Sequence, residues 1–99
     1  MVVVYRLQGV AFAWDDQKAQ RNSTNHGITF AEAAEVFFDP FYQSGDATPT
    51  AVPEQRDFMR GYSVAQRLLL VVSTERRERT RIISARLATR AERKDYESS

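Results

Sequence analysis

Arginine is the residue type of this chain with the clearest chemical consequence. Of fourteen basic side chains, twelve are arginine and only Lys18 and Lys94 are lysine. Residues 56–99 carry a net charge of +5 and residues 1–55 carry −4, so the overall charge of +1 conceals a strong polarity. Arginine presents a planar fork of donors that binds phosphate through two parallel hydrogen bonds. The sequence therefore predicts a phosphate-bearing partner, most simply a nucleic acid, for the C-terminal half.

Most of these arginines fall on or beside three strands that we predict in the C-terminal half. They are Arg56, Arg60, Arg67, Arg76, Arg77, Arg79, Arg81 and Arg86. Because side chains alternate between the two faces of a strand, we expect Arg79 and Arg81 on one face and Arg86 on the other. The whole set is therefore not expected to join one site. Two interpretations stay open: a phosphate-binding cluster, or a solvated surface in which Glu75 and Glu78 pair with neighbouring arginines.

His26 is the only histidine, and imidazole is the side chain best suited to proton transfer near neutral pH. One interpretation makes it a general acid or base, or a phosphate contact. The other places it in the last turn of a helix, directly before Gly27, where a cation meets the negative end of the helix dipole. The spacing alone favours the second interpretation.

Composition limits the remaining function classes. The 99 residues are expected to form one domain, residues 1–99, with a single modest core. Cysteine is absent, which excludes disulfides, thiol nucleophiles and cysteine zinc sites, and we expect no metal site and no cofactor. No stretch approaches the length of a membrane span, and the first residues do not resemble a signal peptide. We therefore expect a cytoplasmic protein without a membrane partner.

The pattern of elements predicts an α+β fold. Asp15 and Gly27 bracket a helix over residues 16–25, and a capping box from Thr29 to Glu32 begins a second helix that ends at Asp39-Pro40. Strands are expected at residues 41–43, 55–62, 67–74 and 79–86, with the apolar run of residues 67–74 in a central position. The last three form an antiparallel meander. A capping box from Thr89 to Glu92 starts a C-terminal helix, pinned to the sheet by Leu87 and Tyr96. Residues 1–11 are either a strand or an N-terminal extension.

Several short motifs, in one order along the chain, carry a resemblance to a known family. They are Phe12-x-Trp14-Asp15, Lys18-Ala19, Asn22, His26-Gly27-Ile28-x-Phe30-x-Glu32-Ala33, Asp39-Pro40, Glu54/Arg56…Gly61, Arg67-Leu68-Leu69-x-Val71-Val72-x-Thr74-Glu75-Arg76 and Arg81-Ile82-Ile83-Ser84-Ala85-Arg86-x-Ala88-Thr89-x-x-Glu92-Arg93-x-x-Tyr96. Each motif is weak alone, but the ordered series from Phe12 to Glu97 is specific. The chain resembles the BrnT-type toxins.

The resemblance implies a ribonuclease toxin of a type II toxin–antitoxin pair, with a fold similar to RelE-type microbial ribonucleases. It implies an RNA substrate, arrest of translation and growth, and a BrnA-like antitoxin through which the complex binds operator DNA. A homodimer or a toxin–antitoxin heterotetramer would be in keeping with such a pair. Two departures stand out. Asn25 replaces the family's common lysine before His-Gly, and Arg77 stands where a turn glycine is common. If that lysine holds phosphate, the chain is instead a catalytically weakened or inactive nucleic-acid-binding homologue.

The expected reaction is metal-independent cleavage, in which the RNA 2′-hydroxyl attacks the adjacent phosphorus and leaves a 2′,3′-cyclic phosphate. Glu54 and Glu75 are weaker candidates for the base than His26. An interaction protein whose arginines meet an acidic partner is the remaining alternative. The expected site residues are His26, Arg56, Arg76 and Arg81 in catalysis, and Arg67, Arg79 and Arg86 in RNA binding.

Overall fold

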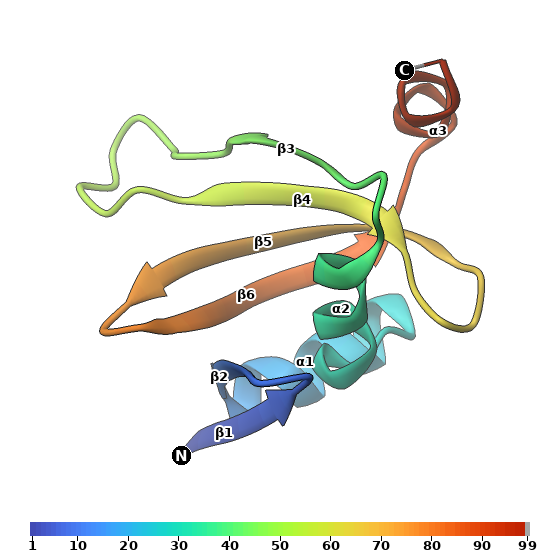
Figure 1. The fold of residues 1–99 in the computed structure, drawn as a ribbon. Coiled ribbons are helices and arrows are strands. Elements are labelled where there is room, and N and C mark those ends of the chain that lie inside the picture. Colours follow the sequence, from blue (N-terminus) through green and yellow to red (C-terminus); the bar gives the residue numbers. More distant parts are fainter. Residues whose placement is uncertain (99) are drawn as a thin grey trace.

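The fold is built on one six-stranded sheet with strand order β1-β2-β6-β5-β4-β3. A computed structural model describes residues 1–98, and Figure 1 shows its course. The elements are β1 (Val2–Leu7), β2 (Val10–Asp15), α1 (Asp16–His26), α2 (Phe30–Glu35), the 3₁₀ helix η1 (Val36–Phe38), β3 (Gln43–Asp46), β4 (Asp57–Tyr62), β5 (Leu68–Arg76), β6 (Arg79–Leu87) and α3 (Arg90–Glu97). The predicted α+β class is confirmed.

The sheet is larger than predicted, and it is mixed. We expected three or four antiparallel strands, whereas β1 and β2 form an additional antiparallel hairpin and β2 pairs with β6 in parallel. The hairpin turns at Gln8 and Gly9, which both have positive φ values (49° and 82°). Strand β2 was not recognised from the sequence because the strand passes directly into α1 at Asp15, with no turn residues between strand and helix. Strand β3 also begins at Gln43, later than the predicted strand over residues 41–43.

Local signals placed the helix ends well. The carboxylate of Asp15 accepts a hydrogen bond from the Lys18 amide (3.0 Å), and Gly27 closes α1 in the left-handed region (φ 69°). The capping box that begins α3 is complete, with Thr89 and Glu92 bonding reciprocally. At the start of α2 the box is only half formed. Thr29 accepts from the Glu32 amide (3.1 Å), but the Glu32 side chain turns away to Arg67, and the helix tightens into η1 after Glu35.

One face of the sheet carries the core. Phe12, Phe30, Leu69, Val71 and Ile82 are almost entirely buried where α1 and α2 pack on the central strands. The predicted central position of β5 is confirmed, because it lies between β4 and β6. No helix in residues 1–98 is long and apolar enough to cross a membrane. The opposite face of the same strands carries arginines beside the half-buried apolar side chains of Phe58, Leu70 and Val72.

A β-bulge in β6 changes which arginines share that opposite surface. Val72 pairs with Ser84, but the next residue, Ser73, pairs with Ile82, so Ile83 is an extra residue on β6. The extra residue reverses the alternation of faces. Our expectation that Arg86 faces away from Arg79 and Arg81 is therefore wrong. Arg86 stands opposite Leu70 and Arg81 opposite Thr74, two residues of β5 that alternate onto the same face.

The turn between β5 and β6 is conformationally strained, which leads to a stability prediction. Arg77 and Glu78 both have positive φ values (48° and 66°), as a two-residue hairpin turn requires, but neither is a glycine. Holding a non-glycine residue in the left-handed region costs about 1 kcal/mol. We expect Glu78→Gly to raise the free energy of unfolding by about 0.5–1 kcal/mol relative to Glu78→Ala, which removes the same charge, in urea denaturation. Equal stability of the two variants would contradict the strain.

Candidate functional site

The surface opposite the core is an arginine face. We use this name for the side chains of Arg60 on β4, Arg76 on β5, and Arg79, Arg81 and Arg86 on β6, together with Arg56, which directly precedes β4. The strand register aligns them. Arg76 pairs with Arg79, and Leu70 is the common partner of Arg60 and Arg86. A single face therefore collects arginines from three adjacent strands.

An open depression of about 610 Å³ lies at the end of this face next to the β5–β6 turn. Its lining is four arginines with two small apolar residues from the N-terminal hairpin: Arg76, Arg77, Arg79, Arg81, Val2 and Ala13. Among the described residues, the side chains of Arg77, Arg79 and Arg81 have no hydrogen-bonded or ion-paired carboxylate. Several guanidinium groups that repel one another without internal neutralisation favour an anion in the depression.

Arg76 has one internal partner, the carboxylate of Glu54. Its Nη2 and Nε atoms donate to Glu54 Oε2 at 2.5 and 3.1 Å. The hydrogen bond from Arg76 holds the pKa of Glu54 below its ordinary value, and the charges of Arg76 and Arg56 act in the same direction. Glu54 is thus a carboxylate at the edge of the depression, beside the arginines that we expect to hold phosphate.

Arg56 follows Glu54 by two residues and directly precedes β4. Its backbone amide donates to Thr48 Oγ1 (2.9 Å), and Thr74 on β5 donates to the carbonyl of Gln55 (2.8 Å), which fixes this loop against β5. The Nε atom of Arg56 is buried and has no hydrogen-bond partner in the described chain. A buried donor without an acceptor destabilises the folded state, so the hydrogen bonds of the loop must offset the free energy that this position of Arg56 costs.

The far end of the arginine face is covered by α3. Arg86 donates to both carboxylate oxygens of Glu92 (2.7 and 3.0 Å), and Arg60 donates to the Glu92 carbonyl oxygen (3.0 Å). The hydrogen bond from Arg86 lowers the pKa of Glu92 to about 2. Arg86 therefore shares the face of Arg81 but, unlike Arg81, is neutralised within the chain.

Arg67 and His26 lie elsewhere. Arg67 contacts Glu32 with two nitrogens, one of them Nε at 2.9 Å, and donates to the Gly27 carbonyl oxygen (3.2 Å). This interaction lowers the pKa of Glu32. Arg67 precedes β5 and Arg76 ends it, a separation of about 30 Å along the strand. The exposed His26 is adjacent to Gly27, which Arg67 contacts, so His26 lies at the same end of the sheet as Arg67.

The structure thus brings together three of the four expected catalytic residues. Arg56, Arg76 and Arg81 gather at one end of the arginine face with Arg79, while His26 does not join them. Arg60 was counted in the arginine cluster but was not among the expected site residues, although its alternation with Phe58 and Tyr62 along β4 was a usable signal. Among the described residues, no three His, Asp or Glu side chains are grouped as metal ligands would be.

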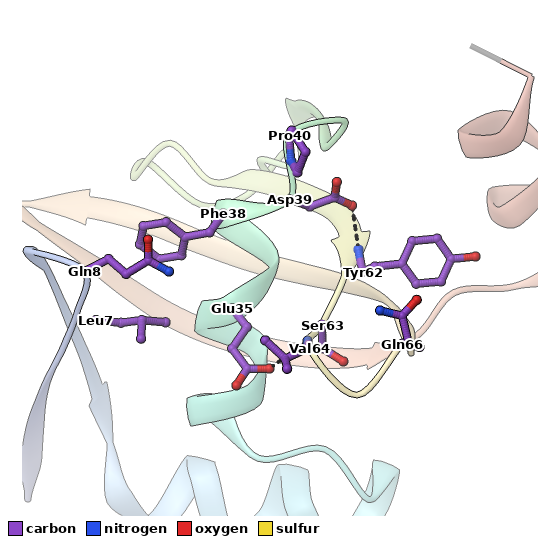
Figure 2. A pocket seen from close by; sticks show the side chains of 10 residues that line it. All are labelled: Leu7, Gln8, Glu35, Phe38, Asp39, Pro40, Tyr62, Ser63, Val64 and Gln66. Atoms are coloured by element: carbon purple, nitrogen blue, oxygen red, sulfur yellow. Dashed lines mark hydrogen bonds between the residues drawn. The ribbon is translucent and has the colours of Figure 1, made fainter.

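A second cavity, of about 370 Å³, opens between the N-terminal hairpin, η1 and the loop after β4 (Figure 2). The two carboxylates that line it already accept hydrogen bonds from within the chain. Glu35 accepts from the Val64 amide (3.0 Å), and Asp39 accepts from the Tyr62 amide (2.8 Å) and the Tyr96 hydroxyl (2.6 Å). Partial burial and then the bond to Asp39 raise the pKa of Tyr96 to about 12. These groups fix loops to one another, and the cavity is lined by no arginine.

The chain is similar to one family of known proteins. The model of the family described as the ribonuclease toxin BrnT of type II toxin–antitoxin systems matches residues 14–92. A crystal structure of the Brucella abortus ribonuclease toxin BrnT is similar to this chain, with a TM-score of 0.58 and 24% sequence identity over 78% of this chain and 94% of that one. That similarity establishes a shared fold, a narrower description than the RelE-like fold we expected. No curated protein matches the chain. Because the family model spans most of its residues, the chain belongs to the family of BrnT ribonuclease toxins of type II toxin–antitoxin systems.

Proposed function

We propose that this chain is an endoribonuclease that holds the scissile phosphate of RNA in the arginine-lined depression. The observation that carries the proposal is the depression itself, where Arg77, Arg79 and Arg81 have no carboxylate partner among residues 1–98. Arg76 and Arg81 supply paired donors to the phosphate oxygens, and Arg56 adds positive charge behind them. Such donors stabilise the extra negative charge that develops on a phosphorane and so lower the barrier to cleavage.

Cleavage then requires a base for the 2′-hydroxyl, and Glu54 is the carboxylate at hand. When RNA phosphate takes the fork of Arg76, Glu54 loses the hydrogen bonds that lower its pKa and becomes a stronger base. Glu54 accepts the 2′-hydroxyl proton, the 2′-oxygen attacks phosphorus, the P–O5′ bond breaks, and O5′ takes a proton from water. The products are a 2′,3′-cyclic phosphate and a free 5′-hydroxyl, and the chain's own groups make the reaction metal-independent.

The antitoxin covers the same face in this proposal. A BrnA-like antitoxin neutralises the toxin with acidic side chains over Arg76, Arg79 and Arg81, because these arginines lack internal partners. It also provides the contact with operator DNA, in a toxin–antitoxin heterotetramer or on a toxin homodimer. Expression with and without the antitoxin tests this step, since growth arrest must be relieved by the partner and by no unrelated acidic protein.

One observation favours a second candidate function, an RNA-binding homologue with weak or absent cleavage. Asn25 replaces the family's common lysine, and it lies directly beside His26 at the exposed end of α1. If the chemistry takes place at that end, the loss of lysine blunts it. If it takes place on the arginine face, on the order of 30 Å away, Asn25 has no bearing on it.

The deciding experiment is RNA cleavage by purified protein in the presence of a chelator, with the 3′ ends identified by mass spectrometry. We expect full activity, cyclic phosphate ends, and near-normal activity of His26→Gln. Activity that requires added metal would overturn the metal-free reaction. A loss of about 10²-fold or more in His26→Gln would move the chemistry to the Arg67 end of the sheet. Binding without cleavage would establish the second candidate.

A further inference from the structure

Two arginines of the arginine face stand apart from the depression and are shielded by α3. Arg60 and Arg86 lie opposite the same residue of β5, Leu70, so their side chains leave the sheet side by side. Arg81 lies opposite Thr74, four residues along β5, which places the two arginine groups about 14 Å apart on one surface. A strand of RNA that crosses the depression can continue in this direction.

Helix α3 offers these arginines two carboxylates, those of Glu92 and Asp95, and the Glu92 carbonyl oxygen, to which Arg60 donates (3.0 Å). Glu92 binds Arg86 through both of its oxygens (2.7 and 3.0 Å), in the fork geometry with which arginine also holds phosphate. The carboxylate of Asp95 lies 3.7 Å from Arg60 Nη1. The Arg60 side chain is nearly buried, yet its Nε atom has no partner in the described residues. The acidic side chains of α3 therefore occupy the positions that phosphates would take.

The attachment of α3 to the sheet is light. None of its residues is buried, and Figure 1 shows it standing clear of the sheet ribbon, beyond the end of β6. Besides the two arginine contacts, it is held by polar and aromatic contacts at its exposed surface. The Tyr96 hydroxyl donates to Asp39 and its ring meets Tyr62 edge to face, Arg93 donates to the Tyr62 hydroxyl (3.1 Å), and Gln43 on β3 donates to the Asp95 carbonyl oxygen (3.1 Å). These contacts are polar and partly exposed, and a phosphate can replace the carboxylate in the fork of an arginine because it offers the same acceptor geometry.

We propose that Arg60 and Arg86 form a second phosphate subsite for RNA, which α3 occupies with Glu92 and Asp95 until RNA displaces the helix. The proposal rests on the proposed function, because it extends the RNA track from the depression along the same face. It gives α3 a role beyond completing the fold. The helix competes with RNA, and it restricts tight binding to strands long enough to reach both ends of the face.

The test compares Glu92→Gln with Glu97→Gln, a variant that loses the same charge from the same helix at a position without an arginine contact. Glutamine still completes the capping box with Thr89, so α3 remains formed, which circular dichroism checks. The probe is a short 2′-O-methylated RNA, which has no free 2′-hydroxyl and cannot be cleaved. We expect Glu92→Gln to bind about two- to fivefold more tightly than Glu97→Gln, because it no longer competes for Arg86.

A second substitution makes the result specific. Adding Arg86→Ala to Glu92→Gln should cancel the gain and reduce the salt dependence of binding by about 0.7, the contribution of one single-strand phosphate. Equal affinities of Glu92→Gln and Glu97→Gln, or a gain that survives the loss of Arg86, would overturn the subsite. Absence of RNA binding by every variant would also overturn it. A protein that shows the expected binding pattern but leaves unmodified RNA intact would retain the subsite and refute the proposed nuclease.

Discussion

Replacing Arg81 with alanine is expected to reduce the rate of RNA cleavage about 10²–10³-fold, and Arg76→Ala is expected to do the same. Both side chains line the depression on the arginine face, from neighbouring strands. Each substitution removes a pair of hydrogen-bond donors from the phosphate oxygens, whose negative charge increases in the transition state. The measurement is the single-turnover cleavage rate at saturating protein, which separates loss of chemistry from loss of binding.

The two variants should differ in one respect. Arg81 has no carboxylate partner in the described chain, whereas Arg76→Ala also leaves Glu54 unpaired beside the phosphate. Adding Glu54→Gln to Arg76→Ala removes that repulsion and the proposed base together, so the double variant should recover binding without recovering cleavage. Arg81→Lys keeps the charge but loses the fork, and its rate should fall between wild type and Arg81→Ala.

Arg21→Ala is the matched control for these variants. Arg21 is an exposed arginine on α1, and its loss changes the net charge of the chain by the same amount. Its cleavage rate should stay close to that of the wild type. Rates for Arg76→Ala and Arg81→Ala equal to that of Arg21→Ala would remove both arginines from the mechanism.

The features that the sequence predicted well depend on neighbours in the chain. Asp15, Gly27 and the Thr89–Glu92 capping box act within one helical turn, so their residue types alone identify the helix ends. The apolar run of β5 likewise predicted a buried central strand. These are the elements whose energy comes from local hydrogen bonds and from burial of a continuous segment.

The features that were missed depend on contacts between distant segments. The parallel pairing of β2 with β6 and the extra residue Ile83 leave no local signature, yet the bulge alone decides that Arg86 shares a face with Arg81. The Glu32 side chain could either complete the local capping box or form a long-range ion pair with Arg67, and in the structure it forms the ion pair. The sequence therefore predicted which arginines could form the candidate site, but not which of them share one face of the sheet.

The largest effect on stability is expected at Asn22, a residue that touches neither the depression nor α3. It is nearly buried on α1, and its Nδ2 donates to the carbonyl oxygens of Ala85 (2.8 Å) and Ile28 (3.1 Å). Its Oδ1 accepts from the Ala85 amide (3.0 Å). The amide side chain thus pairs with β6 as a strand would, at the edge that β2 leaves free, and it joins α1, β6 and the segment before α2.

Asn22→Ala is expected to lower the free energy of unfolding by about 3–5 kcal/mol, because it leaves one amide and two carbonyl groups without their partners, at about 1–3 kcal/mol each. In a domain of this size the melting temperature should fall by about 15–25 °C, measured by circular dichroism. Asn22→Asp, which keeps the acceptor but loses both donors, should be nearly as damaging. Asn25→Ala, on the exposed side of the same helix, should change stability by less than about 0.5 kcal/mol.

Cleavage assays on the Asn22 variants separate support of the fold from catalysis. Below its lowered melting temperature, Asn22→Ala should cleave RNA at a near-normal rate per folded molecule, because the arginine face is built on β4, β5 and β6 and needs α1 only for its core. A cleavage rate that fell while the protein remained folded would show that the position of α1, with His26 at its end, contributes to the chemistry. The same measurement therefore tests whether His26, which lies far from Arg76 and Arg81 in this fold, takes no part in the chemistry.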